Sequence, residues 1–188
     1  MTCFRKAVAA LMLFMMAGCT SNLDLYRDGN MDFGAVHNVA IMPLANLTRE
    51  SPAADRVRDI FASMLLATGG VYVIPPGEVA RGISRAGISN PATPSTEELV
   101  KMAGIIKADA IITGTIREYG EVRSGTASAN VISLSFSMLE AQTGKAVWSA
   151  STTRGGIGIF ERLFGGGGEP MNDITEKAVD DVIKKLFQ

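Results

Sequence analysis

The sequence contains few side chains of the types that carry out catalysis or bind metals. It has one histidine, His37, and its two cysteines, Cys3 and Cys19, lie near the start of the chain. A lone histidine without a neighbouring nucleophile or second ligand is typical of a surface position rather than of an active site. Carboxylates are adjacent at Glu97-Glu98 and Asp180-Asp181, but neighbours on a helix point about 100° apart and do not share one site. We therefore expect no catalytic residues, no bound metal and no cofactor.

Cys19 has the most specific surroundings of any residue in the chain. Two basic residues, Arg5 and Lys6, precede an uncharged apolar run over residues 7–16. This run is shorter than the ~20 apolar residues that cross a bilayer, and its length and flanks are typical of a secretion signal. The residues that follow resemble a bacterial lipobox, although the first position of that motif is usually Leu: they are Met16, Ala17, Gly18 and Cys19.

The lipobox resemblance implies that residues 1–18 are a signal peptide and that Cys19 becomes a lipidated N-terminus. Two or three acyl chains, palmitate among them, would hold the protein firmly on a membrane, because each buried methylene contributes ~0.8 kcal/mol. Thr20 stands where an Asp would resemble an inner-membrane retention signal. We therefore expect a lipoprotein of the outer membrane that faces the periplasm. Residues 19–35 then form a short polar tether, and no thiol is left for a disulfide.

Composition and charge exclude two classes of protein. With 47% hydrophobic and 20% charged residues, the chain has the composition of a globular domain rather than of a disordered one. Removal of Arg5 and Lys6 with the signal peptide leaves 16 of the 18 basic residues against 19 acidic ones. No basic cluster is longer than Lys184-Lys185, so nucleic acid is not an expected partner.

The hydrophobic pattern predicts a sheet that starts with a parallel βαβ unit. Residues 37–44 and 71–75 are apolar runs typical of buried strands, and a helix between them begins at Ser51 and ends before Gly69. A helix that joins two such strands implies a parallel pair with a right-handed crossover. Two further helices are expected, over residues 76–86 and 95–107.

The second half of the chain predicts an antiparallel meander of three strands followed by a helix. The strands are expected over residues 109–119, 129–140 and 146–153, and the helix starts at Asp173. The middle strand alternates so that one face is buried and the other is small and polar: Ile132, Leu134, Phe136 and Met138 alternate with Ser133, Ser135 and Ser137. The order β-α-β-α-α-β-β-β-α predicts one α/β (α+β) domain with a single mixed sheet over residues 36–188.

One segment differs from the rest of the predicted domain. Residues 154–170 place an apolar stretch between Gly155-Gly156 and the four glycines of residues 165–168. Glycines on both sides give such a stretch hinge freedom. It either folds back onto the sheet or docks on a partner protein or on the membrane. Its candidate partner-binding residues are Ile157, Ile159, Phe160, Leu163 and Phe164.

Four stretches of the sequence carry a resemblance to a known superfamily. They read "VAIMPLANLT", "GVYVIPPGEV", "ADAIITGTIREYG" and "ISLSFSMLEAQTGKAVWSAS", and together they span most of residues 39–151. This pattern resembles the superfamily of the curli-secretion lipoprotein CsgG, the penicillin-binding-protein activator LpoB and the amino-terminal domain of TolB. The resemblance implies a lipoprotein or periplasmic domain that works by binding other proteins and has no catalytic activity.

Departures from that superfamily narrow the expected function. The chain lacks the two long amphipathic hairpins with which the CsgG-like channel builds a pore. Its tether of about sixteen residues contains no Pro, and even when extended it spans only ~55 Å. The sequence therefore favours a non-catalytic adaptor in envelope secretion or assembly, bound to the membrane by its lipid and to envelope proteins. An LpoB-like activator of peptidoglycan synthesis, a small-ligand binder or hydrolase at the polar edge of the sheet, and a homo-oligomer remain open.

Overall fold

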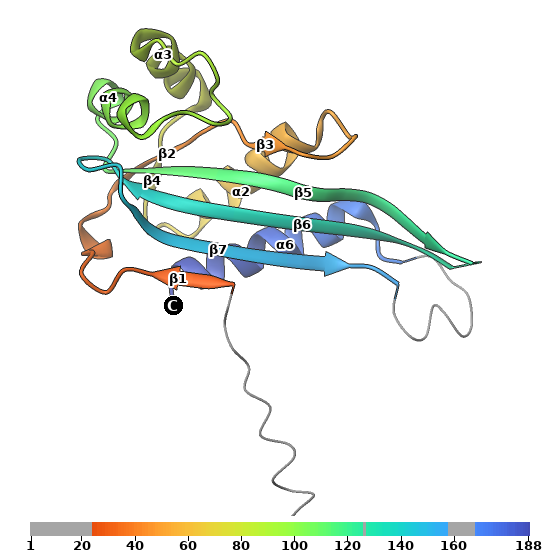
Figure 1. Ribbon diagram of the computed structural model, residues 1–188. Helices are drawn as coiled ribbons and strands as arrows, with labels where there is room; N and C mark the ends of the chain where they lie inside the picture. Colours follow the sequence, from red (N-terminus) through yellow and green to blue (C-terminus); the bar gives the residue numbers. More distant parts are fainter. Residues whose placement is uncertain (1–23, 126, 158–167) are drawn as a thin grey trace, which may run out of the picture.

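The fold is a single mixed sheet with helices on both of its faces (Figure 1). A computed structural model describes residues 24–125, 127–157 and 168–188. In these ranges the sheet has seven strands: β1 (Leu25–Arg27), β2 (Asn38–Ile41), β3 (Ala45–Asn46), β4 (Tyr72–Val73), β5 (Ala110–Ser124), β6 (Ala127–Glu140) and β7 (Ala146–Gly155). The α-helices are α2 (Ala53–Ala67), α3 (Pro76–Ala86), α4 (Thr96–Ile106) and α6 (Met171–Leu186), and a 3-10 helix, η1, spans Phe33–Ala35. The predicted α+β class with one mixed sheet is confirmed.

The predicted βαβ unit is present at one end of the sheet. Strand β2 pairs in parallel with β4, and helix α2 lies between the two strands in the sequence. On its other side β2 pairs in parallel with β5. Helix α2 presents Val57, Phe61 and Leu65 to the sheet, and none of these side chains is exposed. Their spacing of four residues places them on one helix face, which explains why the sequence pattern was informative here.

The antiparallel meander is also as predicted. Strand β6 pairs with β5 on one side and with β7 on the other. The turn between β6 and β7 contains Gly144, whose φ of 68° lies in the left-handed region that favours glycine. Strands β5 and β6 extend further than the expected bounds of 119 and 129, and their pairing continues as far as Ser124 on β5 and Ala127 on β6.

Two short strands were missed by the sequence analysis. Strand β1 lies inside the stretch assigned to the tether, yet it pairs with β7 through Leu25, Tyr26 and Arg27. The folded part of the chain therefore begins earlier than residue 36, which corrects the expected boundary of the tether. Strand β3 has only two residues and pairs with β5. Neither strand is long enough to show an alternating pattern.

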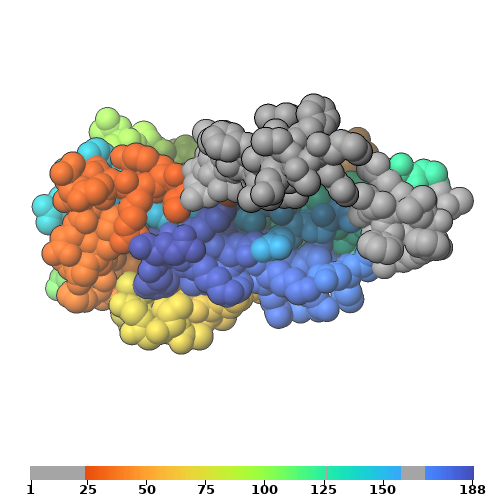
Figure 2. Space-filling view, turned by 90° about the horizontal axis from the view of Figure 1, so that it is seen from below, coloured from red at the N-terminus to blue at the C-terminus, as the bar shows by residue number. Residues whose placement is uncertain are grey.

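The two faces of the sheet are covered differently. Helices α2 and α6 pack along one face, where Phe61 stacks on Phe136 with ring centroids 4.4 Å apart. On the other face, α3 and α4 cover only the end formed by β4, β2 and the start of β5, through contacts with Ala40, Met42 and Ile111. Figure 2 shows α2 (yellow) and α6 (blue) side by side, with the segment that contains β1 and η1 (orange) at the C-terminal end of α6.

The described helices are all short or amphipathic. Within residues 24–125, 127–157 and 168–188, none of them has both the length and the apolar character needed to span a bilayer.

Candidate functional site

Small hydroxyl side chains line the part of the sheet that α3 and α4 leave uncovered. We call this surface the hydroxyl face; it consists of Thr113 and Thr115 on β5, Ser133, Ser135 and Ser137 on β6, and Ser149, Ser151 and Thr153 on β7. The strand register aligns these residues in rows across the sheet, one of which is Thr115, Ser135 and Ser151. Because side chains alternate between the faces of a strand, the intervening residues form the helix-covered core.

Most of these hydroxyls are half-buried in the sheet, and several are hydrogen-bonded within it. The Ser137 hydroxyl donates to Ser149 Oγ at 3.1 Å, and the Ser149 hydroxyl donates to the Phe136 carbonyl at 3.1 Å. The Thr153 hydroxyl donates to Ser133 Oγ at 3.0 Å. Polar groups that already have partners lose little when a second surface displaces their water, so a binding partner could cover this face at low cost.

Two shallow hollows adjoin each other on the hydroxyl face and share Ser135. One, of about 220 Å³, lies next to the N-terminus of α4 and is lined by Thr93, Pro94, Thr96, Thr113 and Thr115 among others. The other, of about 230 Å³, lies toward β1 and is lined by Tyr26, Arg117, Ser149 and Ser151 among others. Tyr26 is 48% exposed. Aromatic and arginine side chains are the types that most often anchor protein interfaces.

The hydrogen-bond partners of the hydroxyl face show which chemistry its side chains can take part in. In the described part of the chain, none of its hydroxyls is hydrogen-bonded to a histidine or carboxylate that could act as a base. The single histidine lies elsewhere, where the His37 backbone N–H donates to Asp109 Oδ2 at 3.0 Å. The arrangement therefore offers hydrogen bonds and shape but no activated nucleophile.

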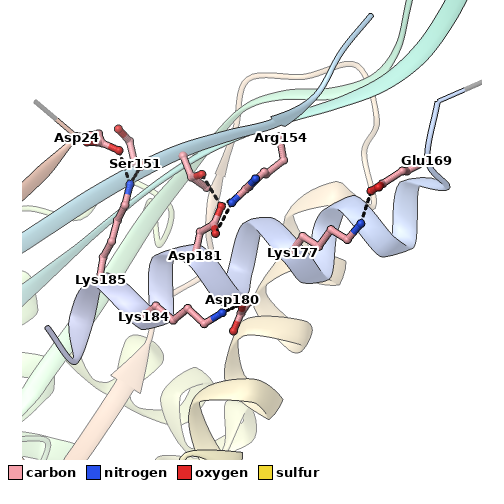
Figure 3. A network of polar contacts seen from close by, with 10 residues as sticks. Asp24, Ser151, Arg154, Glu169, Lys177, Asp180, Asp181, Lys184 and Lys185 are labelled. Carbon is pink, nitrogen blue, oxygen red and sulfur yellow. Dashed lines mark hydrogen bonds and ion pairs between the residues drawn. The ribbon is translucent and has the colours of Figure 1, made fainter. Parts of the chain in front are cut away.

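Helix α6 carries a network of charged contacts to the strands and loops around it (Figure 3). Asp181 accepts hydrogen bonds from Arg154, with 2.6 Å between Arg154 Nη2 and Asp181 Oδ1, and from the Thr152 hydroxyl at 3.1 Å. Asp180 instead accepts from Lys184 at 2.5 Å on the solvent side. Asp181 therefore faces β7 whereas Asp180 faces solvent, so the two adjacent carboxylates do not share one site.

Two carboxyl groups of this network are held in their charged form. The Arg154 guanidinium, which hydrogen-bonds to Asp181, lowers the pKa of that carboxyl, and partial burial opposes the effect. The Lys185 ammonium lowers the pKa of Asp24 in the same way. Lys185 also donates to the Ser151 carbonyl at 2.8 Å. These contacts tie the residue that precedes β1 to the last helix of the chain.

Another hollow of the described surface, of about 510 Å³, has carboxylates in its wall, but each has a structural partner. Asp28 pairs with Lys145 at 2.5 Å, which lowers the pKa of Asp28. Asp109 accepts from the backbone N–H groups of His37 and Asn38. No group of three or more His, Cys, Asp or Glu within the described ranges is placed to hold a metal ion.

Most of the sequence-predicted site residues lie outside the described ranges. This applies to the whole signal-cleavage and lipidation motif, namely Met16, Ala17, Gly18 and Cys19, and to four of the candidate partner-binding residues, Ile159, Phe160, Leu163 and Phe164. Ile157 is described and is half-buried just after β7. Arg154 and Gly155, which were assigned to the Gly-flanked loop, belong to β7.

Three glycines beside the loop lie in the described ranges, and each of them lies close to β6. A Cβ on Gly155, which has a φ of 79°, would lie 2.1 Å from the Asn130 carbonyl oxygen. The Gly156 N–H donates to that same oxygen at 2.8 Å. A Cβ on Gly168 would lie 2.8 Å from the Cβ of Ala129. The absence of a side chain at Gly155 and Gly168 therefore allows the backbone to approach β6 closely.

Comparisons with known proteins place the chain among bacterial lipoproteins. A family model described as "Putative lipoprotein GNA1162-like" matches residues 34–156. The curated relative NMB1124/NMB1162 of Neisseria meningitidis serogroup B is 26% identical over 118 residues, which are 62% of this chain and 54% of the relative. The chain thus spans about half the length of the curated relative that it matches.

Several solved structures share the fold. A PelC dodecamer from Paraburkholderia phytofirmans matches with a TM-score of 0.57 and 18% identity, covering 86% of this chain and 95% of that chain. Lipoprotein GNA1162 from Neisseria meningitidis matches with a TM-score of 0.56 and 20% identity, covering 80% of this chain and 98% of that chain. The LpoB C-terminal domain from Salmonella enterica matches with a TM-score of 0.50 and 13% identity, covering 68% of this chain and 87% of that chain. At these identities the likeness establishes the fold alone, and it confirms the expected resemblance to LpoB-type domains.

Proposed function

Since the chain belongs to the GNA1162-like lipoprotein family, we propose that it is a lipid-anchored adaptor that binds other proteins of the bacterial envelope and has no catalytic activity of its own. Its lipid would be attached to Cys19 and would hold it on the outer membrane, with the domain in the periplasm. Its role would lie in envelope secretion or assembly. The observation that carries this proposal is the hydroxyl face, a broad part of the sheet that the described helices leave uncovered.

A protein partner suits the hydroxyl face for two physical reasons. Small side chains in register make the surface flat, so a second surface can approach it closely over a wide area. Tyr26 and Arg117 stand at its margin and can act as anchors. The partner can be a different envelope protein or a second copy of this chain; the PelC relative of the same fold is a dodecamer.

The proposal is tested by placing a photo-crosslinking amino acid, p-benzoylphenylalanine, at Ser135 in living cells. Ser63 on α2 is an exposed serine outside the hydroxyl face and serves as the control position. We expect a discrete crosslinked species from position 135 and none from position 63. Thr115→Arg, introduced opposite position 135 in the same row of the sheet, should remove the species while the purified domain keeps its thermal unfolding midpoint. Equal crosslinking from both positions would contradict the proposal.

The likeness to LpoB domains favours activation of a penicillin-binding protein as a second candidate function. The position of β1 bears on it, because the sheet begins at Leu25 and leaves only residues 20–24 between Cys19 and the fold. Five extended residues reach about 17 Å, which favours a partner close to the anchoring membrane. Stimulation of peptidoglycan polymerisation in a purified mixture would select this function over the adaptor role.

Lipid attachment has its own test. Cys19→Ser should leave the precursor uncut and should move the protein out of the membrane fraction. An unchanged mass and location would contradict the lipid anchor at Cys19. Separation of inner and outer membranes on a density gradient then decides which membrane carries the wild-type protein.

The apolar stretch after β7 remains a predicted partner-binding segment. Deletion of residues 158–167 keeps Gly155, Gly156 and Gly168, whose contacts with β6 are described. The prediction requires that this variant stays folded and loses a crosslink made from position 157. A variant that unfolds would instead show that the segment belongs to the core.

A further inference from the structure

An apolar cavity of about 320 Å³ lies on the opposite side of the sheet from the hydroxyl face. Its lining residues come from the ends of α2 and α6 and from the segment that contains β1 and η1. These three parts of the chain adjoin one another in Figure 2. Its innermost walls are Val39, Leu65 and Met138, which are at most 2% exposed. The cavity volume falls within the range of small-molecule sites in proteins, and nothing in the proposed adaptor role requires it.

The mouth of this cavity carries one cation in a fixed position. The Arg27 guanidinium stacks over the Phe33 ring, with 3.8 Å between Cζ and the ring centroid. Arg27 Nη1 also donates to the Leu186 carbonyl at 2.7 Å, at the C-terminal end of α6. A guanidinium has five N–H donors in a planar fork, so the two contacts leave donors for a carboxylate. The side chain is therefore preorganised and need not lose further freedom on binding an anion.

The remaining lining supports a flexible apolar ligand rather than a polar one. Val36 and Val71 form side walls, and Phe187, which is 51% exposed, stands at the rim. Gly70 leaves space next to that ring, since a Cβ there would lie 3.1 Å from Phe187 Cε1. A methylene occupies roughly the volume of a water molecule, about 30 Å³, so the cavity can hold a chain of about ten carbons.

We propose that this cavity binds a medium-chain fatty acid, with its alkyl chain between Val39, Leu65 and Met138 and its carboxylate on Arg27. The apolar interior would bind the alkyl chain of the fatty acid, and the Arg27 guanidinium at the mouth would bind its carboxylate. The site is separate from the hydroxyl face, because the two lie on opposite sides of the same strands. The failure of one proposal therefore leaves the other standing.

Trp148 gives the site an intrinsic reporter. It is the only tryptophan in the sequence, and in the strand register it lies between Arg27 on β1 and Met138 on β6. We expect sodium dodecanoate to change its fluorescence and to give a saturable binding isotherm by calorimetry with the purified periplasmic domain. Affinity should rise about fourfold per methylene from hexanoate to decanoate, and it should level off beyond that length.

Two variants and two controls make the test specific. Val71→Phe fills the cavity without removing a polar contact and should abolish binding, whereas Tyr72→Phe changes an exposed neighbour and should not. Arg27→Met keeps the aliphatic stem and should weaken dodecanoate binding at least tenfold, whereas Lys177→Met removes an exposed charge elsewhere and should have no effect. Thermal unfolding of each variant checks that it is folded.

Three outcomes would overturn the proposal. Equal binding of dodecanoate and dodecanol would remove the role of Arg27, and unchanged binding by a folded Val71→Phe variant would place the ligand elsewhere. Arg27-dependent binding to phosphatidylglycerol vesicles, without binding of the free acid, would assign the guanidinium to a phospholipid head group instead.

Discussion

The two faces of strands β5, β6 and β7 are made by alternate residues of the same segments, yet their environments are opposite. On the helix face of β6, Leu134, Phe136 and Met138 are at most 2% exposed and pack against α2 and α6. On the other face, Ser135 and Ser137 lie between these residues and face outward. In the described part of the chain, the face covered by α2 and α6 therefore carries the larger core, whereas the hydroxyl face carries small, mostly half-buried side chains.

The largest difference in stability between the two faces is expected at Phe136. Replacing Phe136 with Ala removes the ring that stacks on Phe61 and leaves a cavity in the core. We expect a loss of about 3–5 kcal/mol in the free energy of unfolding, measured by urea denaturation. The matched change on the other face, Ser135→Ala, should stay within about 0.5 kcal/mol. Similar losses for both variants would mean that the hydroxyl face is also part of the core.

Gly114 on β5 tests how tightly the helix-covered face is packed, because the absence of a side chain at this position makes room for Phe136. A Cβ at this position would lie 2.8 Å from Phe136 Cδ1 and 3.0 Å from the Ser135 carbonyl oxygen. Gly114→Ala should therefore destabilise the domain by about 1–3 kcal/mol through overpacking.

The exposed Gly104 on α4 is the control for this substitution, since a Cβ there meets nothing within 4 Å. Gly104→Ala should stabilise the helix by about 0.5–1 kcal/mol. A stabilising Gly114→Ala would show that the core under β5 is loosely packed.

The large elements of this fold follow from their sequence patterns. The stripe of Val57, Phe61 and Leu65 and the alternation over residues 129–140 both extend over several turns or residue pairs, so each repeats often enough to be recognised. The capping box at Ser95, in which the Glu98 N–H donates to Ser95 Oγ at 3.3 Å, is likewise local in sequence.

What the sequence could not predict depends on contacts between distant residues. Strand β1 is too short to show a pattern, and backbone hydrogen bonds at its two ends hold it against β7. The Asp28 N–H donates to the Val147 carbonyl, and the Ser151 N–H donates to the Asp24 carbonyl. Which part of the sheet is left uncovered depends on where α3 and α4 pack, and no local signal encodes that. The pairing of Asp181 with Arg154 joins residues 27 positions apart.

The ion pair between Arg154 and Asp181 links β7 to α6. Its removal should cause the next largest loss of stability. Asp181→Asn should cost about 1–2 kcal/mol at neutral pH, because a partly buried hydrogen-bonded charge loses its partner. Asp180→Asn, on the exposed side of the same helix, should cost only a few tenths. Thermal unfolding of both variants at pH 7 measures the difference.

The pH dependence of this pair has a definite sign. The pKa of Asp181 in the folded protein lies below its ordinary value of 3.8. The contribution to stability is therefore present above about pH 4 and is lost as the pH falls through the lowered pKa. The gap between wild type and Asp181→Asn should shrink below about pH 4 and stay constant from pH 5 to pH 8. A gap that grows on acidification would contradict this assignment.

The smallest expected effect is on the hydroxyl face itself, at Thr115. Thr115→Val keeps the branched shape that suits a strand and removes only a hydroxyl that faces outward, so unfolding by urea should change by less than about 0.5 kcal/mol. If Thr115→Val instead weakened a crosslink from position 135, the hydroxyl would act in binding and not in folding. A loss above 1 kcal/mol would contradict the division between the two faces, because it would show that the isolated domain depends on both.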